Sequence, residues 1–97
     1  EKPSFPGGES AMKSYLNSTL KYPIYAQENG VQGRVIVQFI IEKDGSMSDV
    51  KVIRSVDPSL DREALRVVKA MPKWTPAKLK GIPVRTKCTT PVVFRLQ

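Results

Sequence analysis

The chain has 97 residues and a net charge of +7, with one cysteine and no histidine. This length suits one domain with a single small core. The missing histidine excludes acid–base catalysis and metal binding through imidazole, and a lone cysteine excludes a disulfide within the chain, so neither an enzyme nor a metal or cofactor site is expected. No apolar run approaches the roughly 18 residues that span a bilayer.

The positive charge is concentrated toward the C-terminus. Residues 1–60 carry seven basic and seven acidic side chains, whereas residues 61–97 carry nine basic and two acidic ones. A one-sided basic field can steer an acidic protein, a nucleic acid or an anionic surface, and it is also an ordinary means of staying soluble. We interpret it first as a contribution to solubility.

The N-terminal part predicts a linker followed by helical segments. Residues 1–8 have Pro and Gly in place of periodic apolar residues, which indicates an extended linker end and places the domain at residues 9–97. From Ser10 to the interruption at Pro23, a helix of about three turns is predicted by helical spacing of Met12, Tyr15, Leu16, Thr19 and Leu20. A further short turn over residues 23–29 would end at Gly30.

Residues 33–55 predict a β-hairpin, because two β-branched runs flank Asp44-Gly45, a pair typical of tight turns. A two-residue turn sets apolar residues opposite one another: Phe39 and Val50, Val37 and Val52, Ile36 and Ile53. The core face then holds Val35, Val37, Phe39, Ile41, Val50 and Val52. The reverse face carries Ile36, Ile40 and Ile53 among polar residues, which is either an interface or a set of scattered surface side chains.

Residues 57–71 predict an amphipathic helix with Asp57 or Ser59 as N-cap and Pro58 in its first turn. Its apolar stripe consists of Leu60, Ala64, Val67, Val68 and Met71. The only tryptophan, Trp74, follows in a basic loop over residues 72–84 that contains three prolines. We expect this stiff loop to aim the next strand, with Gly81 allowing a turn.

A third strand is predicted over residues 84–96. Its alternation puts Cys88, Thr90, Val92, Phe94 and Leu96 inward and Lys87, Val93 and Arg95 outward. Pro91 lacks an N–H and therefore suits a sheet edge. A right-handed crossover lays this strand beside the first one. The predicted fold class is α+β, a three-stranded antiparallel sheet in the order second-first-third with two helices packed on one face and a free edge on the third strand.

Several short motifs then occur in a characteristic order. They are Tyr22-Pro23, Ala26, Gly33, Asp44-Gly45, Trp74-Thr75-Pro76, Gly81 and the run from Pro91 to Phe94. Together they resemble the TonB C-terminal domain family over nearly the whole chain from Tyr22. The lead-in "PSFPGGESAMKSYL" is further similar to versions from Bacteroidetes-type bacteria.

The resemblance implies a periplasmic protein–protein interaction domain of an envelope energy transducer, tethered to the inner membrane by an upstream anchor. Such domains bind the TonB box of outer-membrane transporters, by strand addition to the C-terminal edge strand, and so drive uptake of siderophores, vitamins or glycans. An inner-membrane motor complex supplies the proton-motive force. No nucleic acid and no cofactor are implied.

The candidate partner-binding residues are Gln27, Arg34, Trp74, Arg85, Lys87, Thr89, Val93 and Arg95. The resemblance singles out Gln27 as a polar contact near the transporter box, with an exposed surface glutamine as the alternative. The basic side chains are either electrostatic contacts to an acidic partner or solvated charges. We interpret Trp74 chiefly as a cap on the core, with an aromatic contact to the partner as the alternative, and Cys88 as a small buried hydrophobe.

Other functions stay open. The same type of domain also occurs at the C-terminus of membrane-bound sensor-peptidases, and the related TolA-like proteins bind other envelope partners. A basic nucleic-acid-binding module is less expected, because the aromatic residues fall mostly on core positions. The free edge and the isoleucine-bearing face also allow a homodimer.

Overall fold

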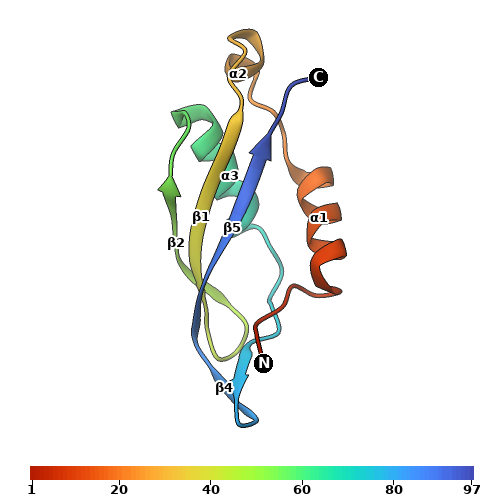
Figure 1. Cartoon of the computed structure of the whole chain (residues 1–97), viewed down its shortest axis with the longest axis vertical. Helices are drawn as coiled ribbons and strands as arrows, with labels where there is room; N and C mark the ends of the chain where they lie inside the picture. Colours follow the sequence, from red (N-terminus) through yellow and green to blue (C-terminus); the bar gives the residue numbers. More distant parts are fainter.

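A three-stranded antiparallel sheet runs along the length of the molecule in the computed structural model, which describes residues 1–97 (Figure 1). The strand order is β2-β1-β5, and β3 and β4 form a separate two-stranded sheet. The elements are, in chain order, α1 (Gly8–Thr19), α2 (Ile24–Glu28), β1 (Gly33–Ile41), β2 (Met47–Arg54), α3 (Pro58–Lys69), β3 (Ala77–Leu79), β4 (Ile82–Val84) and β5 (Thr86–Phe94). The predicted fold class and strand order are thus confirmed.

The core lies between the sheet and α3. Asp57 caps α3 by accepting a hydrogen bond from the N–H of Ser59 at 2.9 Å, and Pro58 occupies the first turn, where its missing N–H costs nothing. Apart from Ala26 of α2, the residues that are fully buried are Val35, Val37, Phe39, Ile41, Leu60, Ala64, Val67, Val68, Val92 and Phe94. They belong to the predicted inward sets of the strands and of the helix. Other members of these sets are only half-buried, namely Val50, Val52, Met71, Cys88 and Leu96. Each large apolar side chain buried in this way contributes about 1.5–3 kcal/mol.

The β1–β2 hairpin corrects the predicted turn. The connection has three residues instead of two, because Glu42 donates its N–H to Ser46 O at 2.8 Å and accepts from the N–H of Gly45 at 2.9 Å. Near the turn the register is therefore shifted by one residue, with Ile41 opposite Met47.

A β-bulge at Asp49, whose φ is 51°, compensates for the longer turn. Val37 consequently lies opposite Val52, as predicted, whereas the expected pair of Phe39 and Val50 falls within the bulge. A second shift sets Ile36 opposite Arg54, so the expected Ile36–Ile53 pair is wrong.

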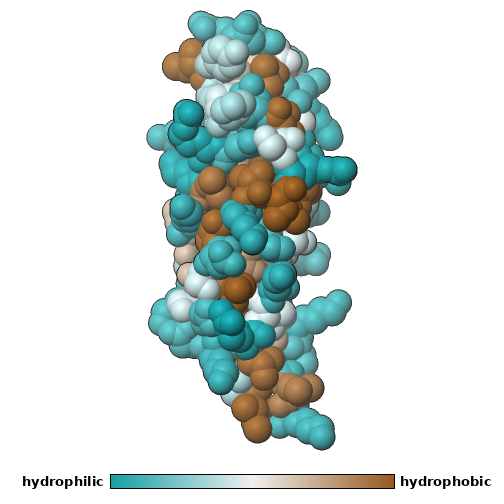
Figure 2. Space-filling model, turned by 90° about the vertical axis from the view of Figure 1, so that its left-hand side faces the viewer, coloured by the Kyte–Doolittle hydropathy of each residue, from teal (hydrophilic) through white to brown (hydrophobic).

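Residues 72–84, expected as a loop, contain the β3–β4 hairpin. Its turn is formed by Lys80 and Gly81, with φ values of 53° and 80°, which is the pattern of a type I′ turn. Ala77 is buried and attaches the hairpin to the body of the domain. Figure 2 shows that hydrophobic atoms gather at the lower end of the molecule, which carries this hairpin in Figure 1.

Trp74 ties the hairpin turn to this region. The backbone N–H of Trp74 donates to Gly45 O at 2.9 Å. The centre of its indole ring lies 5.4 Å from the ring centre of Phe39, in an edge-on arrangement. The indole Nε1 is buried without a hydrogen-bond partner.

The first residues also contact this region. Ser4 and Thr75 exchange two backbone hydrogen bonds of 3.0 and 2.8 Å, and the buried ring of Phe5 packs edge-on against Trp74 at 6.0 Å. The assignment of residues 1–8 as the end of a linker stays a prediction. In this structure residues 1–5 contact the domain through Ser4 and Phe5, a turn follows at Pro6 and Gly7, and Gly8 already begins α1.

Candidate partner-binding edge

β5 is the outer strand on one side of the sheet. It pairs with β1 over its whole length, from Gly33 opposite Phe94 to Ile41 opposite Thr86, and no strand lies on its other side. A strand in this position presents a row of backbone groups that another chain can pair with.

Two observations indicate which backbone groups of β5 face outward. In an antiparallel strand the N–H and C=O of successive residues point alternately to the two neighbours. The N–H of Leu96 points toward β1, since it donates to Gln32 Oε1 at 2.9 Å, one residue before β1 begins. Pro91 is an odd-numbered residue and has no N–H. It is tolerated at a position whose N–H would not pair with β1. The odd-numbered residues of β5 therefore direct their backbone groups to the open edge.

The outward positions coincide with predicted site residues. Lys87, Thr89, Val93 and Arg95 are all exposed, and Val93 keeps 45% of its surface accessible. They alternate with the buried Thr90, Val92 and Phe94. The predicted site therefore supplies both exposed side chains and, by the phase above, the free N–H donors of the edge.

Three predicted residues come together at the end of β5. Arg34 lies opposite Val93 in the β1–β5 ladder, and both line a hollow with Arg95. No acidic side chain lines this hollow, whose other residues are Gln32, Gly33, Phe94 and Leu96. Its two guanidinium groups suit a carboxylate on a partner.

Arg85 is already engaged within the chain. Its guanidinium donates to both carboxylate oxygens of Glu42, at 2.8 and 3.1 Å, across the ends of β1 and β5. The hydrogen bonds between the two side chains lower the pKa of Glu42 and raise the pKa of Arg85. A partner would have to compete with Glu42, so the geometry gives Arg85 a clamping role, and its contact with a partner stays a prediction.

Gln27 and Trp74 lie away from the outward row. Gln27 is exposed on α2, and its Nε2 donates to the backbone oxygen of Tyr22 at 3.2 Å. The ring of Tyr22 in turn packs edge-on against Phe94 at 5.6 Å, which links this segment to the end of β5. Trp74 contacts the hairpin turn instead of β5. Direct partner contacts of either residue stay predictions.

A groove between α1 and β5 was not anticipated. It has a volume of about 320 Å³ and is lined by Met12, Lys13, Leu16, Asn17 and Leu20 from the helix side and by Thr90 to Val93 from the strand. Thr90 is 2% exposed, and its Oγ1 has no hydrogen-bond partner. The sequence predicts Met12, Leu16 and Leu20 as one helical stripe, but it does not show that this stripe borders β5 instead of being buried in the core.

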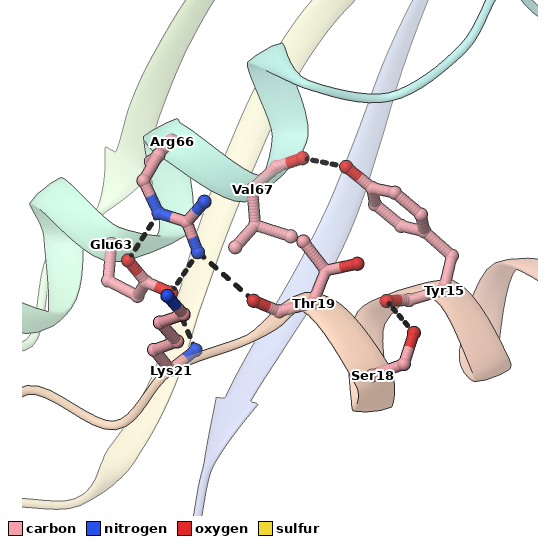
Figure 3. A network of polar contacts seen from close by, with 7 residues as sticks. All are labelled: Tyr15, Ser18, Thr19, Lys21, Glu63, Arg66 and Val67. Atoms are coloured by element: carbon pink, nitrogen blue, oxygen red, sulfur yellow. Dashed lines mark hydrogen bonds and ion pairs between the residues drawn. The ribbon is translucent and has the colours of Figure 1, made fainter.

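Polar contacts hold α1 in place, since no residue of this helix is buried (Figure 3). Tyr15 donates its hydroxyl to Val67 O of α3 at 2.7 Å. Arg66 donates to Thr19 O at 3.0 Å and forms an ion pair of 2.7 Å with Glu63. Glu63 also accepts the N–H of Lys21 at 2.6 Å. The attachment is therefore specific but involves little apolar burial.

The titratable side chains with shifted pKa values take part in structural contacts. No group of three or more His, Cys, Asp or Glu residues lies close enough to hold a metal ion. Burial raises the pKa of the Cys88 thiol, which keeps it protonated at neutral pH. Asp44, Asp57 and Glu63 have lowered pKa values because each accepts hydrogen bonds in a turn, a helix cap or an ion pair. No helix in the structure has the length and apolar character that crossing a membrane requires.

Comparisons with known proteins agree with the fold. The family model for the Gram-negative bacterial TonB protein C-terminal matches residues 18–96. The TonB protein of Helicobacter pylori is 37% identical over 60 residues, which are 61% of this chain and 21% of that protein. The TonB protein of Pseudomonas aeruginosa is 40% identical over 73 residues, or 74% of this chain and 20% of that protein.

One solved structure covers almost the same length. The NMR solution structure of a Helicobacter pylori TonB C-terminal domain superposes with a TM-score of 0.66 and 29% identity, and the match covers 91% of this chain and 95% of that one. The chain thus spans about a fifth of the curated relatives it matches and nearly all of an isolated C-terminal domain.

Proposed function

This chain belongs to the family of Gram-negative bacterial TonB C-terminal domains, and we propose that it is the partner-binding end of an envelope energy transducer. In this proposal it works in the periplasm, tethered to the inner membrane by an upstream segment. It binds the TonB box of an outer-membrane transporter and so couples an inner-membrane motor complex to uptake. The alternatives named above, a sensor-peptidase module or a TolA-like protein, would use the same edge with another partner.

The observation that carries the proposal is the open edge of β5. Lys87, Thr89, Val93 and Arg95 offer N–H donors there, and their carbonyls alternate with these donors along one line. An extended peptide satisfies such a line by adding a strand. About four or five backbone hydrogen bonds, at roughly 1 kcal/mol net each, offset much of the cost of ordering the peptide and give a reversible grip.

Side chains near the edge would add selectivity. The Arg34–Arg95 hollow favours a peptide with a carboxylate at the matching position. The groove beside α1 favours an apolar side chain, because Met12, Leu16, Leu20 and Val93 line it. Gln27 supplies a polar contact only if the peptide extends to α2. An added strand occupies the space beside β5, so α1 must shift outward where it borders Thr90 to Val93.

A proline substitution tests the proposal directly. Thr89→Pro removes one outward N–H, whereas Thr89→Ala keeps the backbone and removes only the exposed side chain. We expect both variants to fold, which thermal melting checks, because the Thr89 N–H does not face β1. Only the proline variant should lose binding to a synthetic TonB box peptide, measured by calorimetry.

Two outcomes would contradict the strand-addition mechanism. One is parental affinity in a folded Thr89→Pro protein. The other is an equal loss of affinity in the alanine variant, which would assign recognition to side chains. Unfolding of Thr89→Pro would show instead that odd-numbered residues pair with β1, and the same pair of substitutions at Cys88 would then carry the test.

A further inference from the structure

The tip of the β3–β4 hairpin carries two large exposed apolar side chains. Leu79 is 65% exposed and Ile82 is 66% exposed, and they lie side by side because they are paired across the hairpin. The type I′ turn of Lys80 and Gly81 separates them along the chain. Figure 1 places the hairpin at one extreme of the molecule, and Figure 2 shows hydrophobic atoms at this end.

The fold does not require these apolar side chains. The hairpin is attached through Ala77, which is buried, and its turn depends on backbone geometry. Polar residues at the two exposed positions would pack equally well. An exposed apolar pair at a protruding end therefore indicates contact with something outside the domain.

The charges around the pair are positive. Residues 78–87 contain Lys78, Lys80, Arg85 and Lys87 and no acidic residue. Arg85 is paired with Glu42, whereas the three lysines form no ion pair. Two acidic residues lie at this end. Asp44 Oδ2 is 3.8 Å from Lys73 Nζ, and Glu1 exchanges backbone hydrogen bonds with Lys78 while its carboxylate forms no ion pair. The tip thus combines an exposed apolar pair with unpaired ammonium groups, one of which, that of Lys80, lies in the turn itself.

We propose that this tip inserts into the headgroup region of an anionic phospholipid bilayer. Lysines attracted to anionic headgroups, next to apolar side chains that enter the acyl boundary, are the combination that binds proteins to membrane surfaces. The tip is convex, so a protein partner would need a matching cavity to bury Leu79 and Ile82, whereas a bilayer needs none. The molecule extends over 50 Å along its longest axis, so the opposite end of β5 stays accessible when the tip is bound.

The test uses sedimentation with vesicles of phosphatidylcholine alone and of phosphatidylcholine mixed with phosphatidylglycerol. The chain should bind only the mixed vesicles, and added salt should weaken binding because it screens the lysines. The double variant Leu79→Ser, Ile82→Ser should lower partitioning by about tenfold or more, and Lys78→Gln, Lys80→Gln should lower it to a similar extent.

A matched control removes another exposed apolar pair from the opposite end. Ile24 and Tyr25 of α2 are 72% and 60% exposed, so Ile24→Ser, Tyr25→Ser should leave vesicle binding unchanged. Thermal melting should show all variants folded, because every changed side chain is exposed.

Three results would overturn the proposal. The first is the absence of binding to mixed vesicles. The second is equal binding by the tip variant, or loss of binding in the α2 control alone. The third is a dimer, seen by light scattering, that the double variant Leu79→Ser, Ile82→Ser dissociates, together with no binding to vesicles. That result would assign the tip to contact with a second copy of the chain. The test does not depend on the transporter peptide, so the strand-addition proposal stands or falls separately.

Discussion

Replacing Gly45 with alanine should destabilise the domain far more than a turn substitution usually does. Gly45 has a φ of 88° and is buried against Trp74. A Cβ at this position would overlap the backbone oxygen of Trp74 and lie 3.2 Å from its carbonyl carbon. Because the obstacle is backbone, it cannot rotate away. Either the β1–β2 turn or the segment around Trp74 must move.

The cost can be worked out from three contributions. An alanine with left-handed φ costs about 1 kcal/mol. Moving the two segments apart breaks the 2.9 Å hydrogen bond from Trp74 N–H to Gly45 O, worth about 1 kcal/mol. It also loosens the edge-on packing of Trp74 on Phe39, worth about 1 kcal/mol more. The free energy of unfolding should therefore fall by about 3 kcal/mol, which lowers Tm by about 12–24 °C for a domain of this size.

Gly81→Ala is the matched control, measured beside Gly45→Ala by calorimetry and urea unfolding. Gly81 has a similar φ of 80°, but nothing lies within 4 Å of its missing Cβ. Gly81→Ala should lower the free energy of unfolding only by the cost of a left-handed φ at alanine, about 1 kcal/mol, which corresponds to about 4–8 °C in Tm. Equal losses in the two variants would refute the role assigned to the Gly45–Trp74 contact.

Three further predictions concern single side chains. Thr90→Val should leave stability unchanged or raise it by up to about 1 kcal/mol in urea unfolding, because the buried hydroxyl has no partner; a clear loss would contradict this. Hydrogen bonds and ion pairs with Arg85 and Arg66 lower the pKa of Glu42 and Glu63. The stabilisation from these pairs is therefore present above the ordinary pKa of 4.5 and disappears as pH falls through the lowered pKa values of the folded state. Tm should drop over that pH range, and it should drop less steeply in Glu42→Gln. Tyr15→Phe removes the 2.7 Å bond to Val67 O and should cost about 1 kcal/mol and speed amide exchange in α1, whereas unchanged exchange would show that the bond does not hold the helix.

Alternation and capping predicted most of the sheet and α3. Burial on one face allows only one phase of side chains, so the inward residues of β1 and β5 followed from period-two patterns. Pro91 marked β5 as an edge strand for an equally local reason, its missing N–H. These predictions succeeded because each depends on a residue's own chemistry or on its near neighbours.

The hairpin register was predicted only in part, because it depends on a distant contact. Asp44-Gly45 favours a two-residue turn, but Gly45 O accepts a hydrogen bond from Trp74, and the turn that makes this possible has three residues. The bulge at Asp49 restores the phase, so the longer turn does not expose the core residues. No local pattern around residue 45 encodes the position of Trp74.

The β3–β4 hairpin and the groove beside α1 were missed for different reasons. Pro76 and Pro83 suggested a loop, yet Pro83 is compatible with a two-stranded hairpin because one side of each strand needs no pairing. The groove depends on where α1 is placed, and α1 is held through side chains such as Tyr15 and Arg66 that a hydrophobic stripe does not reveal. The outward side chains of β5 were predictable, whereas the phase of its backbone groups and the engagement of Arg85 by Glu42 were not.

The strand order β2-β1-β5 also governs how the chain folds. The β1–β2 hairpin is local and forms without long loop closure, but β5 reaches β1 only after the chain has passed through β2, α3 and the β3–β4 hairpin. Closing so long a loop is slow compared with hairpin formation, so we expect the docking of β5 to limit the folding rate. Until it docks, the edge of β1 that β5 later occupies is open. A β5 strand from another molecule would fit the same place, so we expect any strand exchange between molecules to arise before docking and not from the folded state.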